Sequence, residues 1–547
     1  MKRSRIITLA LGLALISSAQ AEKKPNILVI WGDDIGMWNV GAYSHGTMGR
    51  TPNIDRIGKE GMLFTDHYGQ PSCTAGRAAF IMGQLPIRTG MTTIGIPGST
   101  RGIQKSDPTL AEVLKSQGYA TSQFGKNHQG DRNEFLPTVH GFDEWYGNLY
   151  HLNAEEEPEE LDYPGQVNPK LRTAEQSAKF TQMFAPRGML HTWATDVDDP
   201  TDQPKWGRVG KQKIEDIGKL TRKRMETVDA EVTAETLKWL DKHAKGDQPF
   251  FCWYNSTAIH IRSRPAQKYI QMAVDEGRPE EDVVRARMIE HDELVGSLLK
   301  KLDELGIADN TIVIYSTDNG NELMLWPDGG YAPFRGEKGT TWEGGVRVPM
   351  LVKWPGKIAP GTVSNAIQNH EDVFATLAAA GLPNLKEELL TGKKMGEMTY
   401  KAHLDGYNQL DLWTGKTEKG ARNEIFYYDE TDLMALRVGP WKMHIGVKKE
   451  GSWWNDKYYP SIPYFFNLQM DPMEKMDQDS HEWGTTSRQF FAHKMWALNA
   501  SGPIIGAHLK TLLEYPPSQG ADTLSIKKAL EEMQAKMERA AAGGASK

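Results

Sequence analysis

Cysteine and long hydrophobic runs are both scarce in this sequence, and each scarcity limits what the protein can be. Only Cys73 and Cys252 occur among its 547 residues, so the chain can form one disulfide at most. A chain of this length buries a large core without disulfides. Beyond the N-terminus no apolar stretch approaches the length of about 20 residues that a transmembrane helix needs, so we expect no membrane span in the mature protein.

The first 21 residues are typical of a secretory signal peptide. They combine a basic start, a short apolar run and an Ala-Gln-Ala ending, which is the usual order of such signals. We expect cleavage after Ala21 and a mature chain in the periplasm or outside the cell. Loss of the three basic residues of the signal changes the formal net charge from −7 to −10. An acidic chain of this kind argues against a nucleic-acid partner.

Strand and helix patterns alternate along most of the chain. Strands are predicted from runs of apolar and β-branched residues, and helices from apolar residues at helical spacing. The predicted strands are 26–31, 119–124, 249–254 and 311–315, and the predicted helices are 51–59, 109–117, 231–243 and 284–305. Continuous apolar strands separated by helices predict an α/β fold with a large, mostly parallel sheet between helices.

The pattern changes twice along the chain. Residues 152–230 are polar and interrupted by prolines, so we interpret them as a long insertion whose acidic run is solvated surface. From about residue 420, short strands and a closing amphipathic helix from residue 526 predict a smaller antiparallel α+β domain. The domain prediction is therefore a catalytic α/β domain over 22–420 and a C-terminal domain over 421–547. The short strands are 424–428, 434–438, 441–445 and 464–468.

Polar side chains follow four predicted strands of the large domain. The carboxyl ends of parallel strands meet at one edge of a sheet, where ligands bind in α/β proteins. We therefore expect these side chains to form an active site. They are Asp33 and Asp34 after the first strand, Lys126 and His128 after the second, His260 after the third, and Asp318 and Asn319 after the fourth.

The chemistry of the candidate residues falls into three groups. Carboxylate and amide oxygens suit a hard cation such as Ca²⁺ or Mg²⁺ better than zinc. Lysine and arginine neutralise an oxyanion, and histidine moves protons near neutral pH. The oxygen donors are Asp33, Asp34, Asp318 and Asn319, the cations are Arg77, Lys126 and Lys338, and the histidines are His128 and His260. Together they predict hydrolysis of a charged ester.

The two cysteines have different surroundings. Cys252 lies in an apolar run, where cysteine behaves as a small buried hydrophobe. Cys73 lies among small and polar residues, in the stretch "GQPSCTAGRAAFIMG", with Arg77 four positions later. A tyrosine-phosphatase loop has five residues between its cysteine and arginine, whereas this chain has three. That chemistry is therefore excluded for Cys73.

Several stretches, in this order, resemble the type I sulfatases, which are arylsulfatase-like enzymes of the alkaline phosphatase superfamily. The resemblance covers most of the chain. The stretches are "PNILVIWGDDIG", "TPNIDRIGKEGMLFTDHY", "CTAGR", "GYATSQFGKNH", "STAIH", "IVIYSTDNG", "FRGEKGTTWEGGVRVP", "LRVGPWK" and "FNLQMDPMEK". The resemblance implies hydrolysis of a sulfate ester, either an aryl sulfate or a sulfated carbohydrate.

The resemblance also implies a role for each candidate residue. Cys73 would be oxidised by a maturation enzyme to formylglycine (3-oxoalanine), whose aldehyde hydrates to a geminal diol, and Arg77 would hold that group. Residue 73 would bind one Ca²⁺, with Mg²⁺ as the alternative, together with Asp33, Asp34, Asp318 and Asn319. Lys126 and Lys338 would bind sulfate oxygens, and His128 and His260 would act as acid and base.

The sequence departs from the family pattern in places, and rival functions stay open. Ala75 and Ile259 stand where sulfatases usually have proline. A phosphatase, phosphodiesterase or phosphonate hydrolase of the same superfamily usually has a metal-binding histidine after the aspartate, where this chain has Asn319. An unconverted Cys73 would instead leave a catalytically silent protein that binds sulfated glycans. A purely structural role does not account for the filled set of site residues.

Overall fold

The computed structural model describes residues 23–323, 333–482 and 484–525, together with the single residues 527, 528, 530, 531 and 534. The predicted signal peptide over 1–21 and most of the predicted closing helix therefore lie outside the described residues. Within the described residues, no helix has both the length and the apolar character needed to cross a membrane.

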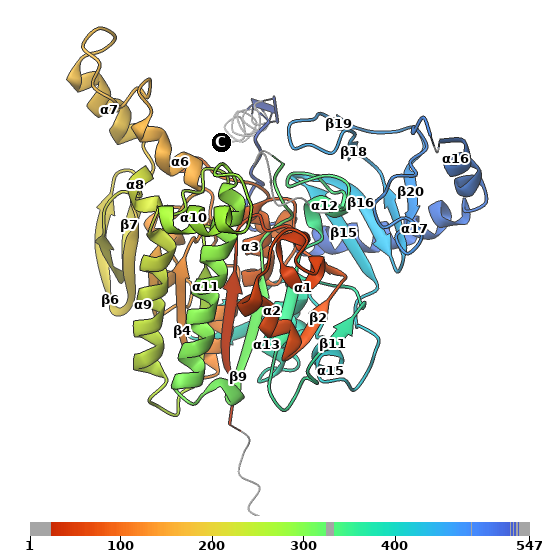
Figure 1. Cartoon of the computed structure of the whole chain (residues 1–547), viewed down its shortest axis with the longest axis horizontal. Helices are drawn as coiled ribbons and strands as arrows, with labels where there is room; N and C mark the ends of the chain where they lie inside the picture. The colour runs from red at the N-terminus through yellow and green to blue at the C-terminus, as the bar shows by residue number, and fades with distance from the viewer. Residues whose placement is uncertain are drawn as a thin grey trace, which may run out of the picture.

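A ten-stranded sheet forms the centre of the molecule (Figure 1). Its middle strands run in the order β9 (Thr311–Ser316), β1 (Asn26–Trp31), β8 (Phe250–Asn255) and β4 (Ala120–Gly125), and all neighbours in this group are parallel. The predicted mostly parallel α/β sheet is confirmed. The outer strands are β11 (Thr362–Ser364), β2 (Met62–Phe64) and β10 (Met350–Lys353) beyond β9, and β5 (Glu144–Gly147), β6 (Leu190–Gln203) and β7 (Gly207–Asp216) beyond β4.

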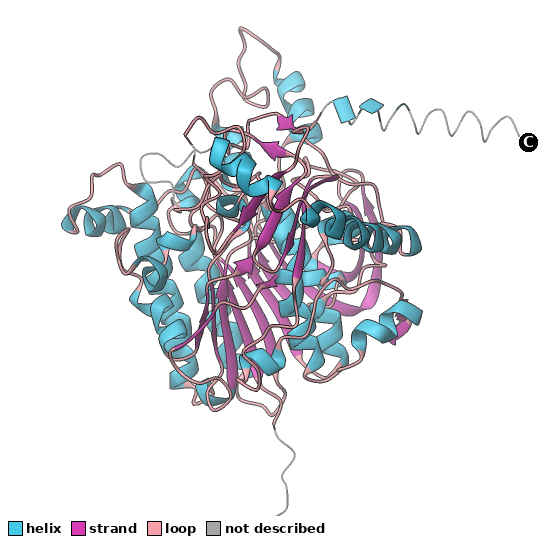
Figure 2. Cartoon of the chain, turned by 90° about the vertical axis from the view of Figure 1, so that its right-hand side faces the viewer, coloured by secondary structure: helices cyan, strands magenta, loops and turns pink. Residues whose placement is uncertain are grey.

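Helices cover both faces of this sheet (Figure 2). Ile27, Val29 and Trp31 of β1 belong to one buried apolar cluster, while Leu28 and Ile30 belong to another. Successive side chains of a strand point to opposite faces, so a strand buried on both faces reads as a continuous apolar run. The first cluster includes residues of α3 (Cys73–Met82), α5 (Leu110–Ser116) and α13 (His370–Ala379), and the second includes residues of α2 (Pro52–Lys59), α9 (Val228–His243) and α11 (Val283–Glu304).

The start of α5 shows how local sequence sets a predicted helix. The Thr109 hydroxyl accepts the backbone N–H of Glu112 at 3.0 Å, and the Glu112 carboxylate accepts the N–H of Thr109 at 2.8 Å. This reciprocal pair is a capping box, which satisfies N–H groups that have no partner inside the helix. The helix predicted over 109–117 is confirmed.

The segment 152–230 is less separate from the large domain than its composition suggests. It contains α6 (Leu152–Glu156) and α7 (Ala174–Phe184). It also contains β6 and β7, an antiparallel hairpin that extends the central sheet beyond β5. The projecting part is the region around α7 (Figure 1). The hairpin is therefore part of the central sheet, and the interpretation of this segment as an insertion stays a prediction for α6 and α7.

The acidic run in this segment is not simply solvated surface, so that prediction is wrong for two of its members. Glu155 and Glu156 are buried. The Glu156 carboxylate forms ion pairs with Arg264 at 2.6 Å and with Arg222 and Arg262 at 3.5 Å each. Burial of a carboxylate becomes tolerable when paired cations replace its water. Composition alone does not disclose such pairing, because Arg262 and Arg264 are more than 100 positions away.

A smaller antiparallel sheet lies at the C-terminal side (Figure 1). Its strands run in the order β15 (Glu424–Asp429), β16 (Asp432–Val438), β17 (Trp441–His444) and β20 (Tyr464–Asn467), and the helices α16 (Gly484–Ala492) and α17 (Trp496–Glu514) follow. The predicted α+β part is confirmed. We propose the domain boundary between 420 and 421, a few residues before β15 begins at Glu424.

Candidate active site

The register of the central strands brings four polar loops to the same level. Trp31, the last residue of β1, pairs with Asn255 of β8 and with Ser316 of β9. Asn255 in turn pairs with Gly125, the last residue of β4. Four neighbouring parallel strands thus end side by side, and the loops that follow them start at one edge. This is the predicted arrangement, and it follows from sheet register rather than from closeness in sequence.

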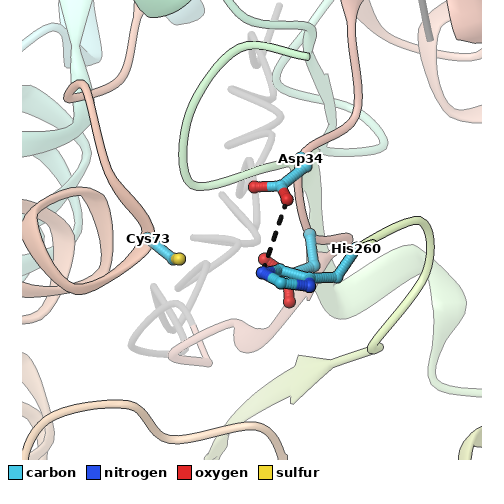
Figure 3. A group of neighbouring side chains, drawn as sticks. Asp34, Cys73 and His260 are labelled. Atoms are coloured by element: carbon cyan, nitrogen blue, oxygen red, sulfur yellow. Dashed lines mark ion pairs between the residues drawn. The ribbon is translucent and has the colours of Figure 1, made fainter. Parts of the chain in front are cut away.

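Cys73 enters this edge from the N-terminus of α3. It is the first residue of the helix and is fully buried. Its sulfur points toward the side chains of Asp34 and His260, which lie within ion-pair distance of each other at 3.6 Å (Figure 3). Burial raises the pKa of the Cys73 thiol to about 11, against the opposing effect of Lys126 and Lys338. An unmodified thiol here is protonated at neutral pH and is a weak nucleophile.

Arg77 lies one helical turn after Cys73 and binds the ends of two strands. Its Nε donates to Asp318 Oδ2 at 3.0 Å, and its Nη1 donates to Asn255 Oδ1 at 2.7 Å. The close approach depends on Gly76, because a Cβ there would lie 2.0 Å from the backbone oxygen of Asp318. Asn255, the last residue of β8, holds this arginine and was not among the predicted site residues.

Two lysines each bind one of the paired aspartates. Lys126 Nζ donates to Asp33 Oδ2 at 2.6 Å, and Lys338 Nζ donates to Asp34 Oδ2 at 2.7 Å. All four side chains are buried. Burial opposes ionisation of Asp34, yet Lys338 and His260 hold the pKa of that carboxyl well below its usual range. Asp34 is therefore charged, and its backbone φ of 61° is a left-handed conformation that few non-glycine residues adopt.

Carboxylates outnumber their nearby cations at this edge. Burial and the neighbouring Asp33 raise the pKa of Asp318 to about 6, although Arg77 opposes the shift. Burial also raises the pKa of Glu322 to about 7, and Lys338 opposes that shift from 3.4 Å. Glu322 was not among the predicted site residues. It lies just beyond the Asp318-Asn319 pair, so its position after β9 was the available signal.

The donor set fits a hard cation. Single ligand atoms of Asp33, Asp34, Cys73 and His260 all lie within 4.8 Å of one another. Asp33 Oδ1 and Asn319 Oδ1 are buried and have no hydrogen-bond partner among the described residues. Buried polar atoms normally have hydrogen-bond partners, and Ca²⁺ and Mg²⁺ prefer oxygen ligands. The orphaned oxygens are therefore what a bound cation of this class would satisfy.

Asp318 differs from the other predicted metal ligands because its carboxylate is already engaged. Oδ2 accepts from Arg77, while Oδ1 accepts the backbone N–H groups of Asp34 at 3.2 Å and Asn319 at 3.0 Å. Oδ1 also accepts the Thr317 hydroxyl at 3.3 Å, and Oδ2 also lies 2.9 Å from Arg77 Nη2, so Asp318 would bind a cation only by giving up or sharing one of these bonds. The hydrogen bonds of Asp318 thus connect α3 with the loops that follow β1 and β9.

His260 has a defined tautomer in this geometry. Its Nδ1 lies 3.0 Å from the backbone oxygen of Ile261, so Nδ1–H donates to that carbonyl. Nε2 then carries the lone pair and accepts from Lys338 Nζ at 3.2 Å. Burial and the nearby Lys338 lower the pKa of His260 well below its ordinary value. His260 and Lys338 together therefore carry one proton more than their neutral forms, and this proton can be passed to a third group.

His128 has no fixed partner. Both of its ring nitrogens are buried without a hydrogen-bond partner among the described residues. Its backbone φ of 57° is left-handed, and strained backbone of this kind is found at functional sites more than elsewhere. Burial and Lys126 lower the pKa of His128 well below its ordinary value. The imidazole is therefore neutral and available to accept a proton.

A third histidine, His151, lies between the two that were predicted. Its ring stacks on His260 with centroids 5.6 Å apart and planes 7° apart, and it meets the edge of His128 at 5.5 Å. His151 Nδ1 accepts the N–H of Ala154 at 3.2 Å, which leaves the proton on Nε2. His151 was not among the predicted site residues because β5, the parallel strand that precedes it, was not predicted.

All of the predicted site residues lie at this edge of the sheet or on the loops that cover it. They are Asp33, Asp34, Cys73, Arg77, Lys126, His128, His260, Asp318, Asn319 and Lys338.

Known proteins resemble this chain over most of its length. Residues 25–381 match the family model described as Sulfatase. The human arylsulfatase A is 30% identical over 95% of this chain and 94% of its own length. The N-acetylgalactosamine-6-sulfatase of Rattus norvegicus is 31% identical over 80% of this chain and 74% of its own length. The crystal structure of the PsFucS1 sulfatase from a Pseudoalteromonas species is similar at a TM-score of 0.73, with 28% identity over 91% of this chain and 92% of that one.

Proposed function

The chain belongs to the sulfatase family, within the alkaline phosphatase superfamily, and from this premise we propose that it attacks its sulfate ester with residue 73 after Cys73 has become formylglycine. As a member it is a sulfuric ester hydrolase of the arylsulfatase-like kind. The observation that carries the proposal is the position of Cys73, whose side chain points toward Asp34 and His260 (Figure 3) and lies near Lys126 and Lys338.

Modification of Cys73 matches the chemistry of its surroundings. A thiol is a soft donor, whereas the carboxylate and amide oxygens around it suit a hard cation. A hydrated formylglycine supplies two hydroxyl groups on one carbon in place of the sulfur. Because Cys73 is fully buried in the folded chain, a maturation enzyme must act on the motif before folding. The mass of the peptide that contains residue 73 separates this proposal from that of a silent glycan-binding protein.

The acidic cluster is the proposed site of one Ca²⁺, with Mg²⁺ as the alternative. Asp33, Asp34, Asp318 and Asn319 would hold the ion together with residue 73. A divalent cation supplies positive charge that lowers the pKa of a nearby hydroxyl and stabilises developing negative charge. Lys126 and Lys338 lie on opposite aspartates of this cluster, which places an ammonium group on each side for the sulfate oxygens.

Proton transfer is assigned to the histidines. The Lys338–His260 pair holds the proton that the departing oxygen needs, because Lys338 donates to His260 Nε2 in the resting geometry. His128 is neutral and unpartnered, so it is the proposed base that removes a proton from residue 73 when the sulfate is expelled. A neutral imidazole near the reacting group is the usual form of a general base.

The first prediction concerns His260. Replacing His260 by alanine is expected to lower kcat/KM by about 100-fold or more for sulfate esters of poor leaving groups. For p-nitrophenyl sulfate the loss should be about tenfold or less, because an activated phenolate leaves without a proton. The measurement is a leaving-group series of aryl sulfates with wild type and variant. His243→Ala, on the last turn of α9, is the matched control. An equal loss across the series would contradict the assigned role.

A second prediction concerns His151. We assign its Nε2–H to the substrate's sulfate or leaving oxygen, because the ring lies between His128 and His260. His151→Asn keeps a side chain that caps α6 but removes the ring, so kcat/KM should fall about tenfold with an unchanged melting temperature. His151→Ala also loses the cap, which contributes about 1 kcal/mol. Wild-type kcat/KM in the asparagine variant would remove His151 from the site.

Substrate class and location follow from the same premise. Relatives of this chain include an N-acetylgalactosamine-6-sulfatase, so we propose a sulfated carbohydrate as the natural substrate and an aryl sulfate as a competent probe. A phosphatase function is the rival, and Asn319, where those enzymes usually have a histidine ligand, favours sulfate. Comparing p-nitrophenyl sulfate with p-nitrophenyl phosphate decides between them. Residues 1–21 are the proposed export signal, so we place the mature enzyme in the periplasm or outside the cell.

A further inference from the structure

A pocket beside the catalytic loops has no role in the reaction described above. Its volume is about 450 Å³, within the range of small-ligand sites. Pro71 and Ser72, directly before Cys73, line one side, and Gly339, directly after Lys338, lines another. Residues 453–456 also line the pocket. They lie in the loop between β18 (Val447–Lys448) and β19 (Lys457–Tyr458), which belongs to the C-terminal part (Figure 1).

Trp453 fixes this loop against the catalytic lysine. Its ring centroid lies 5.3 Å from Lys338 Nζ, and its backbone N–H donates to Glu337 Oε1 at 3.0 Å. A Cβ at Gly339 would lie 2.5 Å from the Trp453 ring, so the indole packs directly on the backbone there. Trp453 therefore holds this loop beside the active site, and the next residue of the loop, Trp454, lies close to that site.

Trp454 is a large aromatic residue of the pocket. This residue lines the pocket and is 77% exposed, whereas tryptophan is highly buried on average. An indole has a broad apolar face, a negative π-surface and a polar N–H edge. The face of a sugar ring, with its C–H groups, is complementary to such a surface, and its hydroxyls reach the polar groups around it. Four hydroxyl side chains and one amide line the pocket, which are Ser72, Thr92, Thr93, Ser525 and Asn455. The hydroxyls of Ser72 and Thr92 donate to backbone oxygens, so toward a sugar they act as acceptors.

The charges that line the pocket balance one another. Lys448 pairs with Asp429 at 3.4 Å, and Lys457 and Lys528 both pair with Asp432, at 2.8 and 2.7 Å. The lining cations are Lys448, Lys457 and Lys528, and the lining anions are Asp429, Glu430 and Asp456. A pocket for a second sulfate would present unpaired cations. Paired charges instead provide both donors and acceptors, as hydroxyl groups require.

We propose that this pocket binds an uncharged sugar residue, stacked on Trp454, next to the sulfated residue that is held at Cys73. The inference rests on the proposed sulfatase function and narrows its substrate to a sulfated oligosaccharide. A monosaccharide sulfate or a small aryl sulfate fills the catalytic site without reaching this subsite.

The kinetic test compares substrates of different length. The probes are p-nitrophenyl sulfate, the monosaccharides galactose 6-sulfate, N-acetylgalactosamine 6-sulfate and fucose sulfate, and the same sugars joined to one or two neutral sugars. Trp454→Ala is expected to lower kcat/KM for the longer substrates about tenfold, the size of one aromatic stacking contact. The loss for the small probes should stay within about twofold. Trp496→Ala, an exposed tryptophan on α17, is the control.

Two outcomes of that comparison overturn the proposal. They are an equal loss on all probes and no loss on the longer substrates. A binding measurement keeps the subsite testable if no probe is hydrolysed, in which case the sulfatase proposal itself fails. The unsulfated oligosaccharides should bind wild type and Trp496→Ala in calorimetry but bind Trp454→Ala about tenfold more weakly. Equal binding to all three proteins would overturn the subsite independently.

Discussion

Replacing Cys73 by serine is expected to limit the enzyme to at most one product per active site. A serine hydroxyl can attack sulfur, the alcohol of the substrate leaves with a proton, and a sulfate ester stays on residue 73. Its release by elimination needs a second hydroxyl on the same carbon, whose O–H bond breaks as the aldehyde re-forms. Serine has no such group, so the sulfate ester should persist.

The measurement is a single-turnover assay together with the mass of the peptide that carries residue 73. We expect a burst no larger than the enzyme concentration and a stable gain of one sulfate on the serine. Cys252→Ala is the control, because Cys252 lies in the middle of β8 and away from the site, and it should retain turnover. Sustained turnover with a serine that mass spectrometry shows to be unconverted would refute the two-hydroxyl mechanism.

Removal of divalent cations is expected to abolish activity, with a loss of about a thousandfold or more. Two buried oxygens, on Asp33 and Asn319, have no hydrogen-bond partner among the described residues, and Asp318 lies close enough to Asp33 and Asp34 to feel their charge. Ca²⁺ or Mg²⁺ should restore activity better than Zn²⁺, because all of the proposed side-chain donors are oxygens. The measurement is activity after chelation and dialysis, followed by addition of single ions.

A variant separates metal binding from catalysis. Asp33→Asn keeps the size of the side chain but removes one negative charge from the cluster. Ca²⁺ should raise the melting temperature of the wild type, since a ligand that binds only the folded state stabilises it, and should raise that of the variant much less. Asp247→Asn, at an exposed ion pair with Lys23, is the control. Zinc as the sole restoring ion would overturn the assignment of a hard cation.

The choice of substitution at Asp318 is limited by its buried ion pair with Arg77. Alanine there would leave Arg77 buried without its main partner, and breaking a buried ion pair costs about 3–5 kcal/mol. Asp318→Asn keeps one oxygen for the backbone N–H groups of Asp34 and Asn319, but it places an NH2 group against Arg77 and also loses the ion pair. Loss of activity in the asparagine variant is therefore informative only where its melting temperature shows that the fold is kept.

Much of the architecture was predictable because its signals are local. A strand buried on both faces must be apolar throughout, so β1, β8 and β9 were found from runs such as the one at 26–31. The capping box at Thr109 and Glu112 marks the start of a helix within four residues. The polar clusters after these strands followed from the rule that parallel strands end together, and the register of β9, β1, β8 and β4 confirms it.

Other features depended on contacts between residues far apart in the chain. β5 was not predicted, so His151 was missed although it touches both predicted histidines. Glu156 was interpreted as surface, yet it is buried against Arg264. The acidity of a run is visible in the sequence, but the cations that allow its burial are visible only once the chain has folded.

The sequence by itself determined the fold class, the family resemblance and the kinds of side chain that carry the chemistry. Each depends on neighbouring residues or on motifs in order. Only the tertiary structure decided which groups meet: Lys338 with Asp34 and His260, Arg77 with Asn255, and Trp453 with Gly339. Side-chain interactions act over a few ångströms, so partners more than 70 positions apart become neighbours only when sheet register and domain packing bring their backbones together.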